Sequence, residues 1–323
     1  MEQAIGMKFL FVSLHSPNCA LTAKKLIFYK IIINFINYSM ALSRVIANIP
    51  TFFTNNNMID YDAISNHINN LINSGVVVIV LFGNVSEASS LSNIERMDLV
   101  QYIHNNFHNN LRVIVQLQPN ETFATSQVAD YINVYHLADY FIMPLPMQNG
   151  ITQDGIYEYF MNQLNLTHLP IIISGNTDIT AETINRLTLF NNLSGVADTS
   201  GNVEHVMNII HMCPNLNVFA TNDMLTLPIM SVGGYGVIST VVNIFPQRIF
   251  QLVVNHMNNA NNNQQNILNH IILINNWCNN SASLKYIMSR FYNNMSLRTV
   301  RLPLLQINEL ADNTYNNLFV EIV

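Results

Sequence analysis

The sequence predicts a (β/α)8 barrel followed by a C-terminal helical domain, an α/β fold, on three observations. From residue 44 onward, short apolar runs alternate with segments whose apolar residues recur at helical spacing. There are eight such runs, and each is a continuous apolar stretch, as in a parallel sheet that helices cover. No Gly-x-Gly-x-x-Gly string follows any run, so an open dinucleotide-binding sheet is not indicated. Eight repeats therefore favour a closed barrel.

The individual elements follow from these patterns. Ile64, Ile68 and Ile72 form one apolar stripe of the first expected helix, and Ser92 with Glu95 forms a capping box before the second. The expected strands are residues 45–49, 76–82, 112–116, 140–143, 170–174, 193–198, 217–220 and 236–239. The expected helices between them are residues 61–73, 94–107, 126–135, 156–164, 181–190, 203–212 and 224–230.

The chain divides into three parts by charge and pattern. Residues 1–39 hold four of the five lysines and one acidic residue, whereas the rest carries nine basic and eighteen acidic residues. We interpret 1–39 as an extension upstream of a true start at Met40, with a weak targeting arm as the alternative. The barrel is expected over 40–248, where Phe245-Pro246 interrupts the chain, and a helical domain with Asn-rich loops over 249–323.

Composition excludes several classes of protein. Half of the residues are apolar and only 10% are charged, and 50 asparagines, typical of AT-rich coding sequence, take the place of charge. No apolar run reaches the roughly 18 residues of a membrane helix. With a net charge of -6 and no basic stretch, no nucleic-acid partner is expected. Three distant cysteines indicate no disulfide framework, so a reducing, cytoplasmic location is expected.

Several strings then resemble, in order, those of the dihydrodipicolinate synthase and N-acetylneuraminate lyase family. They are Ile-Pro-Thr-Phe-Phe at 49–53, Gly-Asn-Val-Ser-Glu-Ala-Ser at 83–89, Asp-Met-Leu-Thr-Leu-Pro at 223–228, Gly-Gly-Tyr-Gly-Val-Ile-Ser at 233–239, Ser-Leu-Lys-Tyr at 283–286 and Leu-Arg-Thr-Val-Arg-Leu-Pro at 297–303. The resemblance covers residues 44–308, nearly the whole chain beyond the extension. It implies a lyase or aldolase in which a lysine on the sixth strand forms an imine with pyruvate.

Most of the residues that this reaction needs are replaced. By the resemblance, the lysine position holds Ala197, the proton-relay tyrosine position holds Ser174, and the two clamp threonines are Asn84 and Val85. Residues 144–146 read Pro-Leu-Pro where the family supplies a tyrosine to the neighbouring subunit. We therefore expect a catalytically inactive, dihydrodipicolinate synthase-like protein, a pseudoenzyme that has lost its Schiff base.

No other residue is expected to rescue the chemistry. Lys285, the only lysine after residue 30, matches a lysine on a C-terminal helix of the family. His104 and His108 have metal-ligand spacing, but they lie on an outward-facing helix without a carboxylate. No metal and no cofactor is expected. Glu204 and His205 are interpreted as residues of a helix start, with contact to a ligand at the barrel mouth as the alternative. By the resemblance, Glu87 matches a family residue of structural role and Asn120 matches a family loop residue.

Three functions remain open at this point. The first is the silent homologue, which binds a small 2-oxo acid or related acid at a vestigial pocket, or pairs with an active relative, and forms a homo-oligomer, a dimer or tetramer. The second is a divergent lyase without a Schiff base, with Asp198 as base. The third is a structural or interaction protein of a virus or parasite. The vestigial pocket is expected to comprise Asn84, Val85, Ser86, Ser174, Asn176, Ala197, Asp198, Ile238 and Ser239.

Overall fold

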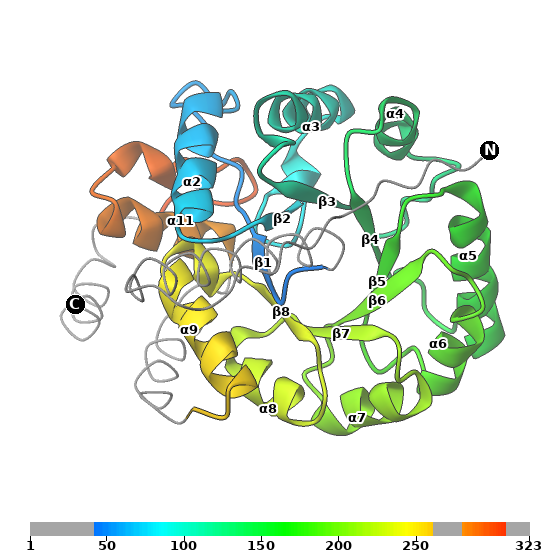
Figure 1. Ribbon diagram of the computed structural model, residues 1–323. Helices are drawn as coiled ribbons and strands as arrows, with labels where there is room; N and C mark the ends of the chain where they lie inside the picture. Colours follow the sequence, from blue (N-terminus) through cyan, green and yellow to red (C-terminus); the bar gives the residue numbers. More distant parts are fainter. Residues whose placement is uncertain (1–41, 261–279, 308–323) are drawn as a thin grey trace, which may run out of the picture. The chain divides into compact units, whose positions relative to one another are not determined.

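Eight parallel strands close into a barrel with helices outside it (Figure 1). The computed structural model describes residues 42–260 and 280–307. The strands are β1 Val45–Asn48, β2 Val78–Leu81, β3 Arg112–Gln116, β4 Tyr140–Pro144, β5 Ile171–Gly175, β6 Leu193–Asp198, β7 Asn217–Ala220 and β8 Gly236–Ser239. Each pairs with the next along the chain, and β8 pairs with β1, Ile46 facing Ile238. The predicted (β/α)8 barrel is confirmed.

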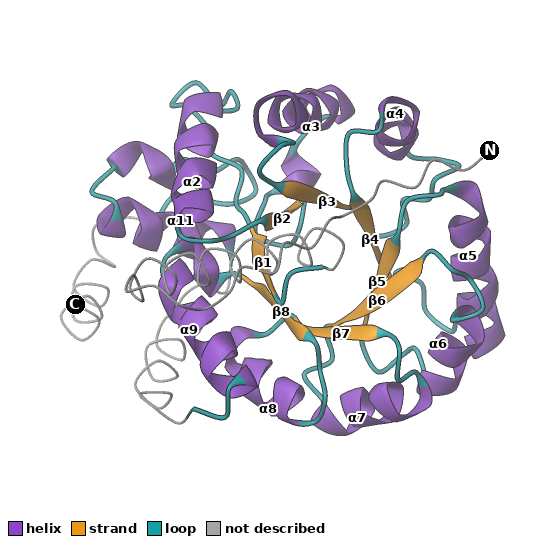
Figure 2. Cartoon of the chain, in the orientation of Figure 1, coloured by secondary structure: helices purple, strands orange, loops and turns teal. Residues whose placement is uncertain are grey.

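A helix follows each strand and lies on the outside of the ring (Figure 2). These helices are α2 Tyr61–Asn73, α3 Asn93–Phe107, α4 Gln127–Tyr135, α5 Gln153–Leu166, α6 Ala181–Leu187, α7 Val203–Met212, α8 Thr226–Ser231 and α9 Pro246–Met257. Short 3-10 turns precede or follow them at η1 Ala88–Ser90, η2 Asp223–Leu225 and η3 Val241–Asn243. Since the chain runs from the carboxyl end of each strand into a helix, the helix N-termini surround that end of the barrel.

Strand alternation separates the core into two layers. One set of strand residues, including Ala47, Val115 and Ile173, packs against the helices in the main hydrophobic core. The alternate set, including Ile46, Ile114 and Phe219, is equally buried but lies outside that cluster, since these side chains point into the barrel. The same alternation decides which residues reach the mouth of the barrel.

The C-terminal part continues beyond the eighth barrel helix. Helix α11 covers Ser281–Phe291 and the turn η4 covers Met295–Arg298. The regular structure breaks at residues 244–245, and Pro246 occupies the first turn of α9, where its missing N–H costs nothing. The domain boundary predicted at Arg248 falls inside this helix, which follows β8 as the other helices follow their strands. The predicted extension 1–39 lies outside the described residues.

No helix in the described ranges is long and apolar enough to cross a bilayer.

Candidate functional site at the barrel mouth

A cavity of about 550 Å³ opens at the carboxyl ends of the strands. Parallel strands of a barrel deliver their last inward-facing residues and the following loops to this end, which is where such folds build sites. The lining comprises Asn48, Asn84, Gln116, Pro119, Ile142, Pro144, Leu145, Pro146, Met147, Gln148, Asn149, Ser174, Gly175, Asn176, Asp178, Ala197, Thr199, Thr221 and Ile238. All eight strands or the loops after them contribute to it.

Five of the nine predicted pocket residues line this cavity: Asn84, Ser174, Asn176, Ala197 and Ile238. Strand register places Ser174 opposite Ala197, so the two positions assigned to the relay and the nucleophile are neighbours on β5 and β6. Ala197 is only 1% exposed and offers a methyl group to the cavity. The geometry thus brings together the two positions that the family resemblance singles out.

The other four predicted residues, Val85, Ser86, Asp198 and Ser239, do not line the cavity. Val85 and Ser86 are buried, and the Ser86 hydroxyl donates to the carbonyl of Gly83 at 2.6 Å. Ser239 donates to the carboxylate of Asp223, which also accepts from the backbone N–H groups of residues 240 and 241. Burial raises the pKa of Asp223, and these hydrogen bonds oppose the shift.

The Asp198 carboxylate serves the loop after β6. It is 2% exposed, accepts from the hydroxyl of Ser200 at 2.6 Å, and accepts from the backbone N–H of Gly201 at 3.2 Å. Its neighbour Ala197 faces the cavity, so strand alternation turns Asp198 the other way. The side chain therefore organises a turn and is not directed at the mouth.

Sequence reasoning missed seven polar lining residues. Four of them lie at or just after strand ends, namely Asn48, Gln116, Thr199 and Thr221, and three lie in loops, namely Gln148, Asn149 and Asp178. Asn48 and Gln116 are the last residues of β1 and β3, and the two threonines follow β6 and β7 closely. The sequence signal that could have identified the residues at strand ends is a polar residue at, or just beyond, the carboxyl end of an apolar strand. Asn48 donates from Nδ2 to Oδ1 of Asn84 at 2.9 Å, and its own Oδ1 is buried without a partner among the described residues.

The cavity lining is almost without charge. It includes no Lys, Arg or His, and its one ionisable residue is Asp178, which is exposed at the rim. The remaining polar groups are side-chain amides and hydroxyls, and the apolar ones include Ile142, Leu145 and Ile238. The mouth can therefore offer hydrogen bonds to a ligand but, within its lining, no amine and no cation.

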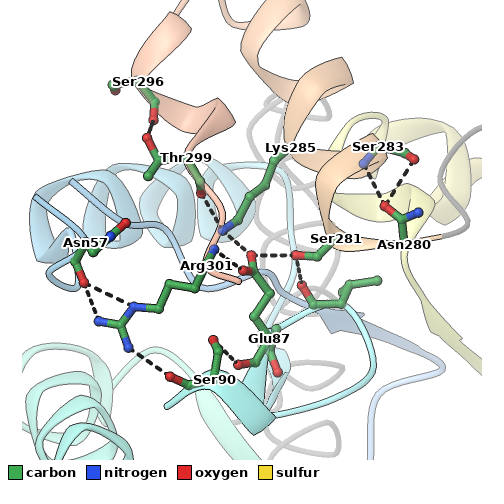
Figure 3. Close-up of polar contacts among 12 residues, drawn as sticks. Asn57, Glu87, Ser90, Asn280, Ser281, Ser283, Lys285, Ser296, Thr299 and Arg301 are labelled. Atoms are coloured by element: carbon green, nitrogen blue, oxygen red, sulfur yellow. Dashed lines mark hydrogen bonds and ion pairs between the residues drawn. The ribbon is translucent and has the colours of Figure 1, made fainter. Parts of the chain in front are cut away.

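The single lysine of the described ranges lies elsewhere. Lys285 on α11 is fully buried, with its Nζ 2.5 Å from Oε1 of Glu87 and 2.9 Å from the carbonyl of Thr299 (Figure 3). The ammonium also lies 4.3 Å from the ring centroid of Phe53. Burial lowers the pKa of Lys285 to about 8, and the adjacent Glu87 carboxylate opposes that shift. Lys285 does not line the cavity.

Glu87 joins the loop after β2 to the C-terminal segment. Its backbone is left-handed, with φ of 56°, and its carboxylate also accepts from the hydroxyl of Ser281 at 2.9 Å and the backbone N–H of Arg301 at 2.8 Å. The guanidinium of Arg301 pairs with Glu95, and this hydrogen bond lowers the pKa of Glu95 to about 2. We call Glu87, Glu95, Lys285 and Arg301 the charged junction. Its geometry agrees with a structural role for Glu87.

The remaining predicted residues take no part in the cavity. His104 and His108 stack with ring centroids 5.0 Å apart on the outer surface of α3. The backbone N–H groups of Glu204 and His205 donate to the cap residue Asn202, so both lie in the first turn of α7. Asn120 accepts from the backbone N–H of Met147 and so supports a loop that lines the cavity. In the described ranges no three His, Cys, Asp or Glu residues are grouped to hold a metal ion.

The model of the Dihydrodipicolinate synthetase family matches residues 41–321. The chain belongs to this family. A 4-hydroxy-tetrahydrodipicolinate synthase from Methanococcus aeolicus is 30% identical over 207 residues, which cover 61% of this chain and 70% of the relative. The corresponding enzyme from Oceanobacillus iheyensis is 28% identical over 220 residues, covering 66% and 74%. The resemblance inferred from local strings is confirmed at the level of the family.

Solved structures of the family share the fold. One crystal structure of a dihydrodipicolinate synthase superposes with a TM-score of 0.78 at 25% identity, covering 87% of this chain and 99% of that one. A dihydrodipicolinate synthase from Bacillus anthracis superposes with a TM-score of 0.80 at 22% identity, covering 88% and 99%. This member of the Dihydrodipicolinate synthetase family thus keeps the barrel while its mouth lining holds no amine.

Proposed function

We propose that this chain is a family member that no longer performs Schiff-base chemistry. The observation that carries the proposal is the lining of the barrel mouth, which includes no lysine and presents the methyl group of Ala197 from β6. An imine requires a primary amine, and a guanidinium stays protonated and cannot replace it. The other four lysines of the chain, at positions 8 to 30, precede the barrel and lie outside the described residues.

The loss extends beyond the nucleophile. Ser174, which holds the position assigned to the relay tyrosine, lines the cavity, but a serine hydroxyl is much shorter and far less acidic than a phenol. Val85, at one clamp position, is buried, and Asn84 at the other pairs with Asn48. Since three separate roles are affected together, restoring one residue would not restore the reaction.

The test is borohydride trapping with pyruvate, read by intact mass. We expect no reduced adduct on the wild-type protein beyond residue 40. Ala197→Lys provides the control, because its amine would extend into the cavity and form the adduct slowly. Turnover should remain negligible in that variant, because Ser174 and Val85 are unchanged. A wild-type adduct mapped to any residue of the barrel contradicts the proposal.

The alternative of a lyase that uses Asp198 as its base is not favoured by the geometry. Its carboxylate is buried and already accepts hydrogen bonds from Ser200 and Gly201. The expected small-acid ligand also lacks a cationic partner in the lining. No described contact supports the third alternative, a structural or interaction protein of a virus or parasite.

We further propose that the protein forms a homo-oligomer in a reducing compartment. Soluble oligomers usually have closed symmetry, so the expected assembly is a dimer or tetramer. Cys213 is buried as a free thiol, as in proteins of reducing compartments. Light scattering after size-exclusion chromatography tests the assembly, and a mass of one chain at micromolar concentration would contradict it.

A further inference from the structure

We propose that the barrel-mouth pocket binds a small uncharged molecule that carries hydroxyl and amide groups, and that it rejects the corresponding carboxylate. The proposal rests on the function proposed above, because an imine-forming site would instead retain a 2-oxo acid covalently. It adds the class of ligand, which the loss of the nucleophile does not by itself decide.

Polar groups without a protein partner converge on the cavity, and one of the polar atoms at the mouth, Oδ1 of Asn48, is buried. The side chains of Gln116, Ser174 and Thr199 line it and have no hydrogen-bond partner among the described residues. The hydrogen bond from Asn48 to Oδ1 of Asn84 leaves the amide nitrogen of Asn84 without a described acceptor. Amides and hydroxyls can donate and accept, so this set suits a ligand that presents both kinds of group. Apart from Asn48, these groups come from four different strands or the loops after them, so they surround the ligand instead of contacting one edge of it.

The lining also accommodates a carbon skeleton. Ile142, Leu145, Ile238 and the prolines of residues 144–146 alternate with the polar groups around the cavity. A volume of about 550 Å³ is within the range of pockets that enclose small organic ligands. The mixture of apolar surface with a few convergent polar groups is the usual composition of such a site.

The charges around the mouth act against an anion. Asp178 stands at the rim, and six of the helices whose N-termini surround the mouth carry an acidic residue in the first turn. These residues are Asp62, Glu95, Asp130, Asp154, Glu182 and Glu204. Glu95 and Asp154 are paired with Arg301 and Arg186, whereas each of the other four carboxylates offsets the field of its helix dipole, which would otherwise attract an anionic ligand.

At three of these helix starts a cap residue also occupies one or two of the free backbone N–H groups. Thr152 accepts from the N–H of Gly155 at the start of α5, Thr180 accepts from the N–H of Thr183 at the start of α6, and Asn202 caps α7. A carboxylate entering the cavity would therefore lose its hydration without gaining a cation or a free helix terminus. Burying an unpaired charge is costly, whereas an amide of the same shape loses much less when the lining amides and hydroxyls supply its hydrogen bonds.

The experiment compares three molecules of one carbon skeleton: gluconamide, gluconate and glucamine. Titration followed by saturation-transfer NMR should show gluconamide binding at least about tenfold more tightly than gluconate, a difference of about 1.4 kcal/mol. Glucamine should bind no more tightly than gluconamide, because the only carboxylate in the lining is exposed at the rim. Ser174→Ala should weaken gluconamide binding several-fold. The matched control Ser194→Ala, on β6 but outside the cavity lining, should leave it unchanged.

A charge-introducing variant makes the test decisive. Gln116→Arg places a cation in the lining and should shift the preference toward gluconate, while thermal melting confirms that the variant is folded. Equal or tighter binding of gluconate by the wild type overturns the proposal, as does tighter binding of glucamine, or no binding of gluconamide up to its solubility. Borohydride trapping is read separately, so an adduct would refute the loss of Schiff-base chemistry whatever the preference among these three molecules.

Discussion

The loop after β2 contributes Asn84 to the barrel mouth and Glu87 to the charged junction, and the polar groups of these two regions differ in whether they have protein partners. At the mouth, Asn84 faces a cavity whose amides and hydroxyls are largely without protein partners. Three residues later, Glu87 is buried and saturated by Lys285, Ser281 and the backbone of residue 301. The same short loop thus contributes one side chain to an open polar pocket and another to a buried ion pair.

The difference teaches which part of the molecule holds the fold and which part is available for a ligand. Charged groups buried at the junction stabilise only as a complete set, because each would be costly without its partner. Several polar groups at the mouth, including those of Gln116 and Ser174, line an open cavity and have no described protein partner, so the fold does not depend on pairing them. Changes at the junction should therefore affect stability, and changes at the mouth should affect binding.

The largest effect is expected from removing the buried ammonium. Lys285→Met keeps the length of the side chain but leaves Glu87, whose side chain is 3% exposed, without its counter-ion. We expect the free energy of unfolding to fall by about 3–5 kcal/mol, measured by chemical denaturation. The double variant with Glu87→Gln should recover part of this loss.

Arg186→Met is the matched control for that measurement. This substitution removes a surface ion pair in which the side chain of Arg186 is 47% exposed and that of Asp154 is 83% exposed. The free energy of unfolding should fall by less than about 1 kcal/mol. A Lys285→Met protein as stable as this control would mean that the junction does not depend on its charges.

A second effect concerns pH. His67 on α2 is buried beside Asn243, Nε2 to Oδ1 at 2.8 Å, and its ring meets Tyr292 of the C-terminal segment edge-on. Burial lowers the pKa of His67 to about 4, and the hydrogen bond to Asn243 opposes the shift. As the pH falls, His67 is protonated in the unfolded state at a higher pH than in the folded state. The contribution of neutral His67 to the free energy of unfolding is therefore fully present above about pH 6.5 and is lost as the pH drops toward 4.

The contribution of His67 to this fall is about 3 kcal/mol, from a shift of about two and a half pKa units. Melting temperatures of the wild type and of His67→Gln should be recorded between pH 4 and 7. The melting temperature of the variant should change less with pH than that of the wild type. His108→Gln, at an exposed position on the outer surface, should follow the wild type. Parallel curves for all three proteins would contradict the assignment to His67.

A much smaller effect is expected at the mouth. Gln116→Leu removes a half-buried amide that has no described partner, so the free energy of unfolding should change by less than about 0.5 kcal/mol. The same denaturation experiment measures it beside Lys285→Met. A loss above about 2 kcal/mol would show that Gln116 is held by a contact outside the described residues, and the contrast between the two regions would weaken.

The smallest effect is expected from deleting residues 1–39. The barrel begins at Val45 and closes through pairing of β1 with β8. We therefore expect residues 40–323 to melt within a few degrees of the full chain. An insoluble product, or a melting temperature far below that of the full chain, would assign the extension to the fold.

The sequence predicted the barrel well because each strand is a short apolar run with polar residues at its ends. The bounds of β3, β6, β7 and β8 agree with the predicted ranges, and α2 and α7 agree as well. Helix ends were less accurate where a cap was not recognised: α5 begins at Gln153, since Thr152 accepts from the N–H of Gly155. Helix α6 ends at Leu187, three residues before the predicted end.

The site was predicted only in part, for a reason of geometry. Ala197 and Asp198 are adjacent on β6, yet one lines the cavity and the other is buried behind it. Ser239 was expected at the mouth, but Asp223 from the preceding loop binds its hydroxyl. Successive residues of a strand point to opposite faces. A prediction that assigns two adjacent residues at a strand end to the cavity is therefore wrong for one of them.

By itself, the sequence determined the alternation of strands and helices and the chemical inventory of the chain. Only one lysine follows residue 30, so the scarcity of amines in the barrel needs no structure to establish. The tertiary structure alone decided that this lysine, Lys285, pairs with Glu87, 198 positions away along the chain. It also decided that Asn48, Gln116 and Thr221 meet at one cavity. The physical reason is that the spacing of apolar residues depends only on neighbours along the chain. The partner of a buried charge, and the face to which a residue at a strand end points, are determined only when the barrel closes.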